Sequence, residues 1–206
     1  GVVFRCTPGG ILTALEQFTG VSGAAKGSYP IGSLAVGPDG ALYGTTLLGG
    51  SLDLGTVFKV TTGGVFTTLV EFTSAGASNR GHNPNGGLTL AADDNFYGMT
   101  TFGGASNIGT VFRMTPAGVL TTLVEFTGNG ATGKGSKPVG DLTLGSDGHL
   151  YGLTSEGGAS GKGTVFRITT DGVHTVLVHF SGTSGAAKGA FPKGSMAQGL
   201  DGNFYG

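Results

Sequence analysis

Four cationic side chains recur at one spacing in the sequence and could bind an anion. Each lies 54 residues from the next, and they are Lys26, Arg80, Lys134 and Lys188. Ammonium and guanidinium groups form charge-assisted hydrogen bonds with carboxylate, sulfate or phosphate groups. If the four positions meet on one rim of a fold, they predict a ligand-binding ring of positive charge that fits an anionic glycan or another subunit. The solubility of charged loops would explain the same pattern.

Acidic and phenolic side chains follow the same period, as Asp39, Asp93, Asp147 and Asp201 and as Tyr43, Tyr97, Tyr151 and Tyr205. The aspartates could be catalytic carboxylates or calcium ligands. Three of them precede a glycine, however, and Asp-Gly forms tight turns because the carboxylate accepts hydrogen bonds within its own turn. We therefore expect one Asp turn in each repeat, and we expect the tyrosines to pack between structural units with their hydroxyl groups hydrogen-bonded.

The remaining chemical motifs predict neither a cofactor nor a metal site nor catalytic residues. Gly128 to Gly133 spells a dinucleotide fingerprint, but Pro138 and a predicted strand follow where a helix should begin. His174 and His179 would point to opposite faces of a strand, because their spacing is odd. Cys6, the single cysteine, shares its register with apolar residues and is expected in the core.

Composition excludes several classes of protein. Gly supplies 44 of 206 residues and charged residues only 11%, which disfavours helices. A net charge of −1 lacks the basic excess that nucleic-acid binding requires. No apolar run reaches the ~18 residues of a transmembrane helix, so membrane insertion is not expected.

The elements that must position these side chains form a fourfold repeat. Phenylalanines mark it at positions 4, 58, 112 and 166, and the 54-residue period defines a single repeat domain over residues 1–206, with the fourth copy 10 residues short. Each copy predicts four short strands, as at 87–90, 95–100, 110–115 and 119–126, because β-branched and aromatic residues alternate between turn signals. The last of these strands is apolar on both faces, so both faces should be covered.

Four-stranded units stacked on both faces are typical of the blades of a β-propeller. We therefore predict an all-β propeller of four blades, each with four antiparallel strands. The sequence begins with a third and fourth strand and ends with a first and second strand, so these terminal half-blades would complete one blade and close the ring. An open half-ring that dimerises into eight blades, and an excerpt of a longer array, share the same repeat.

The repeated units Gly-Thr-Val-Phe-Arg-Met-Thr-Pro-Ala-Gly, Leu-Thr-Thr-Leu-Val-Glu-Phe and Asp-Gly-His-Leu-Tyr-Gly-Leu-Thr resemble the GloVer-type, or choice-of-anchor, tandem repeats of bacterial secreted proteins. The resemblance covers essentially the whole chain. It implies a propeller-like fold and an extracellular or cell-surface location, and it implies no reaction and no catalytic residues.

Long connections should share one face of the repeat array, which often marks the binding side of a repeat protein. We therefore expect a non-enzymatic extracellular binding or structural module, whose partner is an anionic glycan, a cell-surface polymer or other copies of the chain, assembled as a homo-oligomer or filament. The alternative is a glycan hydrolase or lyase at the propeller mouth, which requires clustered carboxylates or a histidine or tyrosine base.

Overall fold

Three complete four-stranded antiparallel sheets, or blades, form the body of the protein. The computed structural model describes residues 1–74 and 81–206. The first blade consists of β3 (Ala35–Val36), β4 (Leu42–Thr46), β5 (Thr56–Val60) and β6 (Phe66–Glu71). The second consists of β8 (Thr89–Leu90), β9 (Phe96–Thr100), β11 (Thr110–Met114) and β12 (Leu120–Glu125). The third consists of β13 (Ser136–Leu144), β14 (Leu150–Glu156), β15 (Thr164–Ile168) and β16 (His174–His179).

Three further two-stranded sheets complete the described part of the chain. They pair β1 (Val2–Cys6) with β2 (Leu12–Gln17), β7 (Gly81–His82) with β10 (Phe102–Gly103), and β17 (Ala197–Gln198) with β18 (Phe204–Tyr205). All strand pairs are antiparallel, and the all-β prediction is confirmed. The described residues include no helix long and apolar enough to cross a membrane.

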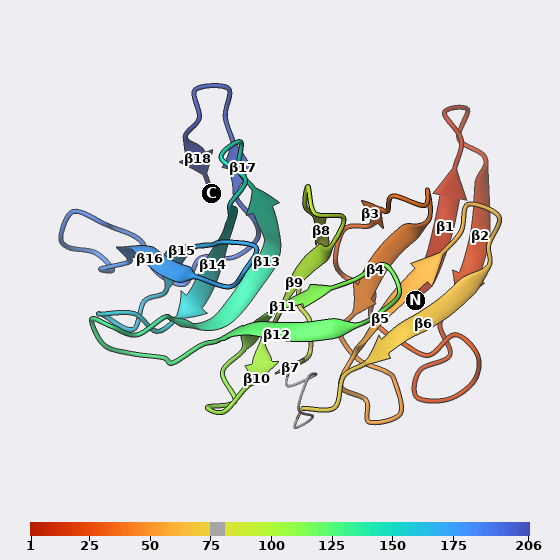
Figure 1. Cartoon of the computed structure of the whole chain (residues 1–206), viewed down its shortest axis with the longest axis horizontal. Coiled ribbons are helices and arrows are strands. Elements are labelled where there is room, and N and C mark those ends of the chain that lie inside the picture. Colours follow the sequence, from red (N-terminus) through yellow and green to blue (C-terminus); the bar gives the residue numbers. More distant parts are fainter. Residues whose placement is uncertain (75–80) are drawn as a thin grey trace.

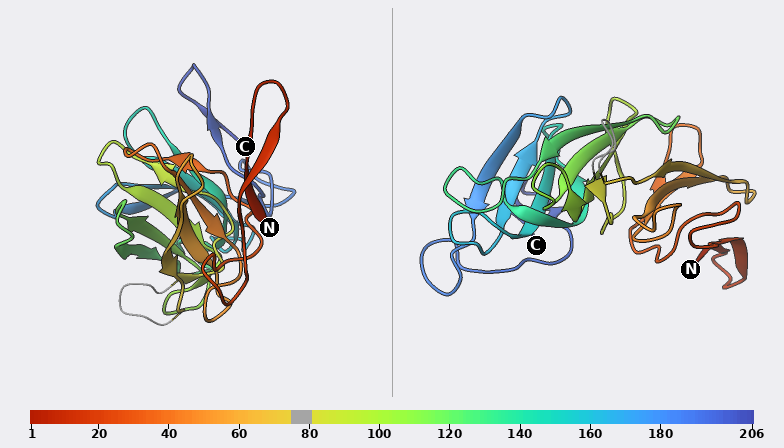
Figure 2. Two further views of the ribbon diagram at one scale, coloured as in Figure 1. Left: turned by 90° about the vertical axis from the view of Figure 1, so that its right-hand side faces the viewer. Right: turned by 90° about the horizontal axis from the view of Figure 1, so that it is seen from below.

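The blades stand side by side in an open arc, which corrects the predicted four-bladed ring. The β1–β2 and β17–β18 hairpins are separate sheets at opposite ends of the arc and do not complete one blade within the chain (Figures 1 and 2). Closure depends on the angle between neighbouring blades. That angle is set by side chains packed between sheets, and in this structure the four repeats leave the arc open. Cys6 of β1 is exposed, contrary to its predicted place in the core.

Aromatic side chains fill the spaces between blades. Phe72, which follows β6, contacts Phe112 of the next blade with ring centroids 5.6 Å apart, and Tyr43 stacks on Phe96 at 4.3 Å. All four rings are at most 1% exposed. Aromatic pairs in these geometries add stability beyond the area they bury. The prediction that both faces of each blade are covered is therefore confirmed for the first two blades, whereas one face of the third blade borders a hollow lined by Val165 and Val178.

The recurring Asp and Tyr residues have the predicted structural roles in the three complete blades, where the tyrosines are buried, whereas Tyr205 is exposed. In the second blade, Asp93 Oδ1 accepts the main-chain N–H of Asn95 at 3.2 Å, and Tyr97 Oη donates to Asp93 Oδ2 at 2.8 Å. The same hydroxyl lies 3.3 Å from the carbonyl oxygen of Thr170 in the third blade. Tyr43 Oη lies 3.4 Å from the carbonyl oxygen of Pro116 in the same way, so these two pairs link their turns to the neighbouring blade.

Candidate functional site

The described members of the predicted cation ring do not converge on one hollow. Lys26 Nζ lies 2.8 Å from Glu71 Oε1, and this ammonium group lowers the pKa of Glu71 to about 2. Lys134 is half-buried, and its main-chain N–H donates to Thr127 Oγ1 at 3.1 Å. Lys188 is exposed beside a hollow next to β16, and Arg80 lies outside the described residues. Ligand binding by this set stays a prediction.

The long connections share one face of the array, as predicted. Contacts at the last residue of the fourth strand show this arrangement, because the side chain there binds the loop between the second and third strands of the same blade. Glu71 accepts the N–H of Ser51 at 2.6 Å, and Glu125 accepts the N–H of Ala105 at 2.8 Å. His179 occupies the same position in the third blade, and its Nδ1 accepts the N–H of Ala159 at 3.1 Å. The sequence predicted only an outward-facing position there.

Close backbone contacts hold the axial segments, which lead into the first strand of each repeat. Gly86 illustrates the contact, because a Cβ atom at this position would lie 2.0 Å from the carbonyl oxygen of Gly140. Side chains add links between segments: Asp141 Oδ1 accepts the N–H of Gly87 at 2.6 Å, and Ser195 Oγ accepts the N–H of Asp141 at 2.8 Å. The axial segments are therefore close and rigidly spaced.

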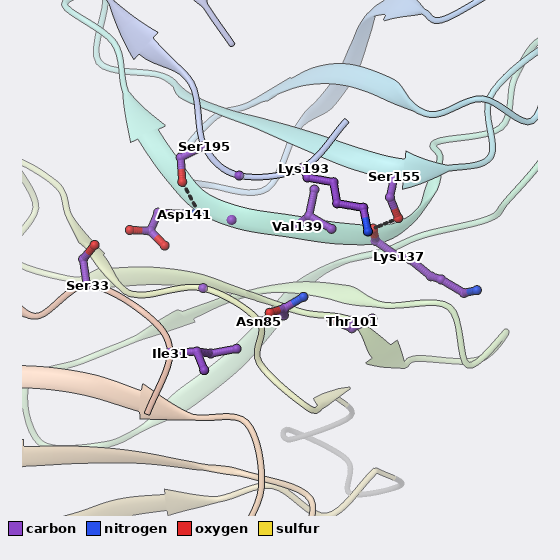
Figure 3. Close-up of a pocket in the computed structure, with 13 residues that line it drawn as sticks. Ile31, Ser33, Asn85, Thr101, Lys137, Val139, Asp141, Ser155, Lys193 and Ser195 are labelled. Carbon is purple, nitrogen blue, oxygen red and sulfur yellow. Dashed lines mark hydrogen bonds between the residues drawn. The ribbon is translucent and has the colours of Figure 1, made fainter. Parts of the chain in front are cut away.

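A cleft of about 570 Å³ opens between the axial segments of the four repeats, and we call it the axial cleft. The segment with Ile31 and the segment with Asn85 lie across the cleft from Val139 and Lys193 (Figure 3). Polar side chains supply much of the remaining lining, and they are Ser33, Thr101, Lys137, Asp141, Ser155 and Ser195. Such a volume accepts one or two sugar rings or a ligand of similar size.

The charges at the axial cleft are few and are placed unevenly. Lys137 points away from the cleft in Figure 3, and its Nζ lies 2.8 Å from Glu156 Oε1. The exposed Lys193 extends over the cleft, whereas Asp141 is half-buried in its wall. The cleft thus offers one ammonium group and one carboxylate on opposite parts of a lining rich in hydroxyl groups.

One hydroxyl in the wall lacks a hydrogen-bond partner. Thr101 Oγ1 is buried and, within residues 1–74 and 81–206, no partner lies within hydrogen-bonding distance. An unpaired buried hydroxyl costs about 1–3 kcal/mol. The sequence offered no signal for Asn85, Thr101, Asp141 or Lys193 as lining residues, because residues of these types do not recur at their positions in the repeat.

The axial cleft forms no metal site among the described residues, which contain no group of three or more His, Cys, Asp or Glu side chains that could hold an ion. What the cleft can do chemically is donate and accept hydrogen bonds through hydroxyl, amide, ammonium and carboxylate groups. A ligand with many hydroxyl groups matches these partners.

The fold and its axial cleft define a propeller-like repeat protein. The chain belongs to the Gloeobacter/Verrucomicrobia repeat family, whose model matches residues 1–206. This membership confirms the resemblance found in the sequence. No curated protein matches the sequence significantly.

Solved structures share the fold at low sequence identity. Virginiamycin B lyase from Staphylococcus aureus superposes with a TM-score of 0.63 at 19% identity, over 98% of this chain and 55% of the lyase chain. A putative gluconolactonase gives 0.58 at 16% identity, over 98% and 62% of the two chains. A putative 6-phosphogluconolactonase from Bacteroides uniformis gives 0.56 at 17% identity, over 98% and 55%. The chain thus spans a little over half the length of these neighbours.

Proposed function

We propose that this protein is a non-enzymatic extracellular binding module whose axial cleft holds a glycan with an acidic group. The observation that carries the proposal is the convergence of four repeats on one hydroxyl-lined cleft with a single exposed ammonium group, that of Lys193. Sugar hydroxyl groups would bond to Ser33, Asn85 and Ser195, while an acidic sugar would pair with the ammonium group. The extracellular location rests on the sequence resemblance.

Binding rather than hydrolysis is favoured by the carboxylates of the cleft. Glycoside hydrolysis ordinarily uses two carboxyl groups on either side of the scissile bond. Among the described residues that line the axial cleft, Asp141 carries the one carboxyl group, and its Oδ1 already accepts the N–H of Gly87. A role for Asp141 as an acceptor for a ligand hydroxyl group fits this arrangement.

Calorimetric titration with an acidic oligosaccharide, such as an oligomer of uronic acids, tests this function. Asn85→Ala combined with Lys193→Ser removes two side chains that make no hydrogen bond to other described groups, so folding should persist. We expect affinity to fall at least about tenfold, since a hydrogen bond to a charged group contributes about 1.5–3 kcal/mol.

Lys188→Ser is the matched control, because Lys188 is an exposed lysine of the same segment that does not line the axial cleft. It should leave affinity unchanged. A second variant carries Ser at all four positions of the cation ring, Lys26, Arg80, Lys134 and Lys188. If this variant loses binding while the Asn85→Ala, Lys193→Ser variant binds normally, the cation ring is the site and the axial cleft is not. Release of reducing ends during the titration would instead favour the hydrolase.

A further inference from the structure

A second hollow, of about 470 Å³, lies among the long loops of the second and third blades, and we call it the loop hollow. Ser136 and Glu156, which oppose one another in the β13–β14 pair, form part of its wall. The rest of its lining includes Ile108, Gly157, Gly161 and Phe191. None of the residues that line the loop hollow also lines the axial cleft, so the two hollows are separate sites.

The second repeat fills the equivalent space with its own side chains. His82 and Phe102 oppose one another in the β7–β10 pair, 54 residues before the pair that lines the loop hollow, and their rings stack with centroids 5.5 Å apart. His82 Nε2 lies 3.1 Å from Asn107 Oδ1, and the same oxygen accepts the N–H of Gly103 at 2.9 Å. A ring and an amide carbonyl oxygen therefore occupy this place in the second repeat.

The third repeat lacks both of these groups. Ser136 and Glu156 stand where the second repeat has its two rings, and Gly161 stands at the position of Asn107. Gly161 has no side chain that could accept the N–H of Gly157. The loop hollow thus corresponds to three smaller or polar replacements, which leave room for one ring and one acceptor.

The polar groups around the loop hollow are a hydroxyl group, an N–H group and a neutralised carboxylate. Ser136 is 7% exposed, and within the described residues its hydroxyl group has no hydrogen-bond partner. The N–H of Gly157 lacks the side-chain acceptor that the first repeat also supplies, where Asp53 Oδ1 accepts the corresponding N–H at 2.7 Å. Glu156 Oε1 lies 2.8 Å from Lys137 Nζ, so the charges of this pair cancel. The loop hollow therefore suits a neutral ligand that brings an acceptor and several hydroxyl groups.

We propose that the loop hollow binds an N-acetylated amino sugar, at a site independent of the function proposed for the axial cleft. The acetamido group has the same amide chemistry as the side chain of Asn107, and its carbonyl oxygen would accept the N–H of Gly157. The sugar ring would take the place that the imidazole of His82 has in the second repeat. Its hydroxyl groups would bond to Ser136 and Glu156.

The apolar part of the wall is anchored to neighbouring loops. The main-chain N–H of Phe191 donates to the carbonyl oxygen of Lys162 at 2.9 Å, and Lys162 Nζ lies 4.8 Å from the centroid of the Phe191 ring. The carbonyl oxygen of Ile108 accepts the N–H of Lys137 at 2.8 Å. A sugar ring carries C–H groups that pack on aromatic and aliphatic side chains as well as hydroxyl groups. This wall therefore favours a sugar over an inorganic anion.

NMR titration of the protein with methyl glycosides tests the class of ligand. The probes are the methyl glycosides of N-acetylglucosamine and N-acetylgalactosamine, and the comparison compounds are the methyl glycosides of glucose and galactose, which lack the acetamido group. We expect an N-acetylated probe to shift the amide signals of Gly157 and Gly161 and to bind at least about fivefold more tightly than its comparison compound. Equal affinity for the two kinds of glycoside, or no binding of either probe, would overturn the proposal.

Gly161→Asn supplies from the chain the acceptor that the ligand would bring. Gly161 has a φ of 68°, close to the 53° of Asn107, and a Cβ atom there would lie 3.7 Å from its nearest neighbour, so the variant should fold. The added carboxamide should accept the N–H of Gly157 and lower affinity for the N-acetylated probe at least about fivefold.

Gly148→Asn is the matched control. Gly148 has a φ of 78°, and a Cβ atom there would meet nothing within 4 Å. Asp94 occupies the same position of the second repeat with a φ of 60°, so a side chain is accommodated there. Because Gly148 does not line the loop hollow, this variant should bind the probe as the wild type does.

Exchanging ligands and variants separates the loop hollow from the axial cleft. The Asn85→Ala, Lys193→Ser variant should bind the N-acetylated probe normally, and Gly161→Asn should bind the acidic oligosaccharide normally. Probe binding that Gly161→Asn leaves unchanged, or that disappears in the Asn85→Ala, Lys193→Ser variant, would contradict a site in the loop hollow. Neither result would bear on the binding of acidic glycans at the axial cleft.

Discussion

Acidification should destabilise the protein through one histidine, His174 in β16. Its ring stacks on Phe166 with centroids 5.0 Å apart and meets the edge of Phe126 at 5.8 Å, and its buried Nε2 has no hydrogen-bond partner within the described residues. Burial, assisted by the charge of Lys134, lowers the pKa of His174 from 6.5 to about 4. The folded protein therefore holds this imidazole neutral at a pH where an unfolded chain would protonate it.

The sign and size of the effect follow from linkage. Between about pH 6.5 and pH 4 the unfolded state binds the additional proton, so the stability that is present above pH 6.5 is lost as the pH falls toward 4. This shift in the pKa of His174 corresponds to about 3 kcal/mol in the free energy of unfolding if the ring is fully buried. Because the ring is partly exposed, we expect a loss of about 2 kcal/mol in the free energy of unfolding at pH 4.5. Asp39 and Glu71, whose pKa values are about 2, remain ionised at that pH.

Urea unfolding at pH 7 and pH 4.5 measures this loss. His174→Leu should abolish most of it, since Leu120 fills the same position of the second blade and is 7% exposed. His149→Asn is the control, because Asn95 and Asn203 occupy its position in other repeats, and it should keep the full pH dependence. Equal losses in the wild type and His174→Leu, or an NMR titration that places the pKa of His174 at or above 6.5, would refute the reasoning.

Three further predictions concern contacts between blades, and each is measured by thermal or urea unfolding. Gly86→Ala should destabilise the fold by more than about 2 kcal/mol, because its Cβ would lie 2.0 Å from a carbonyl oxygen, whereas Gly63→Ala, whose nearest atom is 3.8 Å away, should have little effect. Ala35→Thr should stabilise the fold by about 0.5–1 kcal/mol, because the equivalent residues Thr89 and Thr143 donate hydrogen bonds to carbonyl oxygens of the next repeat at 2.5 and 2.6 Å. An unchanged free energy of unfolding would contradict the equivalence of the repeats at this position. Tyr97→Phe should cost about 1 kcal/mol by removing the hydroxyl bonded to Asp93 at 2.8 Å, and an unchanged midpoint would show that this link adds nothing.

The sequence predicted the blades well because their strands depend on short-range signals. The predicted strands at 95–100 and 110–115 correspond to β9 (Phe96–Thr100) and β11 (Thr110–Met114). The Asp-Gly turns and the 54-residue period fixed which strands pair. The curvature of the arc could not be predicted in this way, because it depends on how rings such as Tyr43 and Phe96 pack between sheets.

The axial cleft escaped prediction for a different physical reason. Residues that repeat, such as Asp93 and Tyr97, perform the same structural task in every blade. The prediction of a binding ring therefore fell on cations that repeat, and one of them, Lys26, proves to pair with Glu71. The cleft uses side chains that differ between copies, and only the folded chain shows that those positions meet.

The axial cleft is asymmetric because one repeat position holds a different residue in each of the four copies. The position that precedes the axial glycine holds Ile31, Asn85, Val139 and Lys193 in the four copies. The glycine itself is present in every copy, and at Gly32, Gly86 and Gly140 a side chain would collide with the next segment. The backbone that forms the cleft is thus constrained to repeat while its lining is free to vary. A ligand would consequently meet an apolar, an amide and a cationic group at fixed places, which selects one orientation of the ligand where four identical groups would accept several.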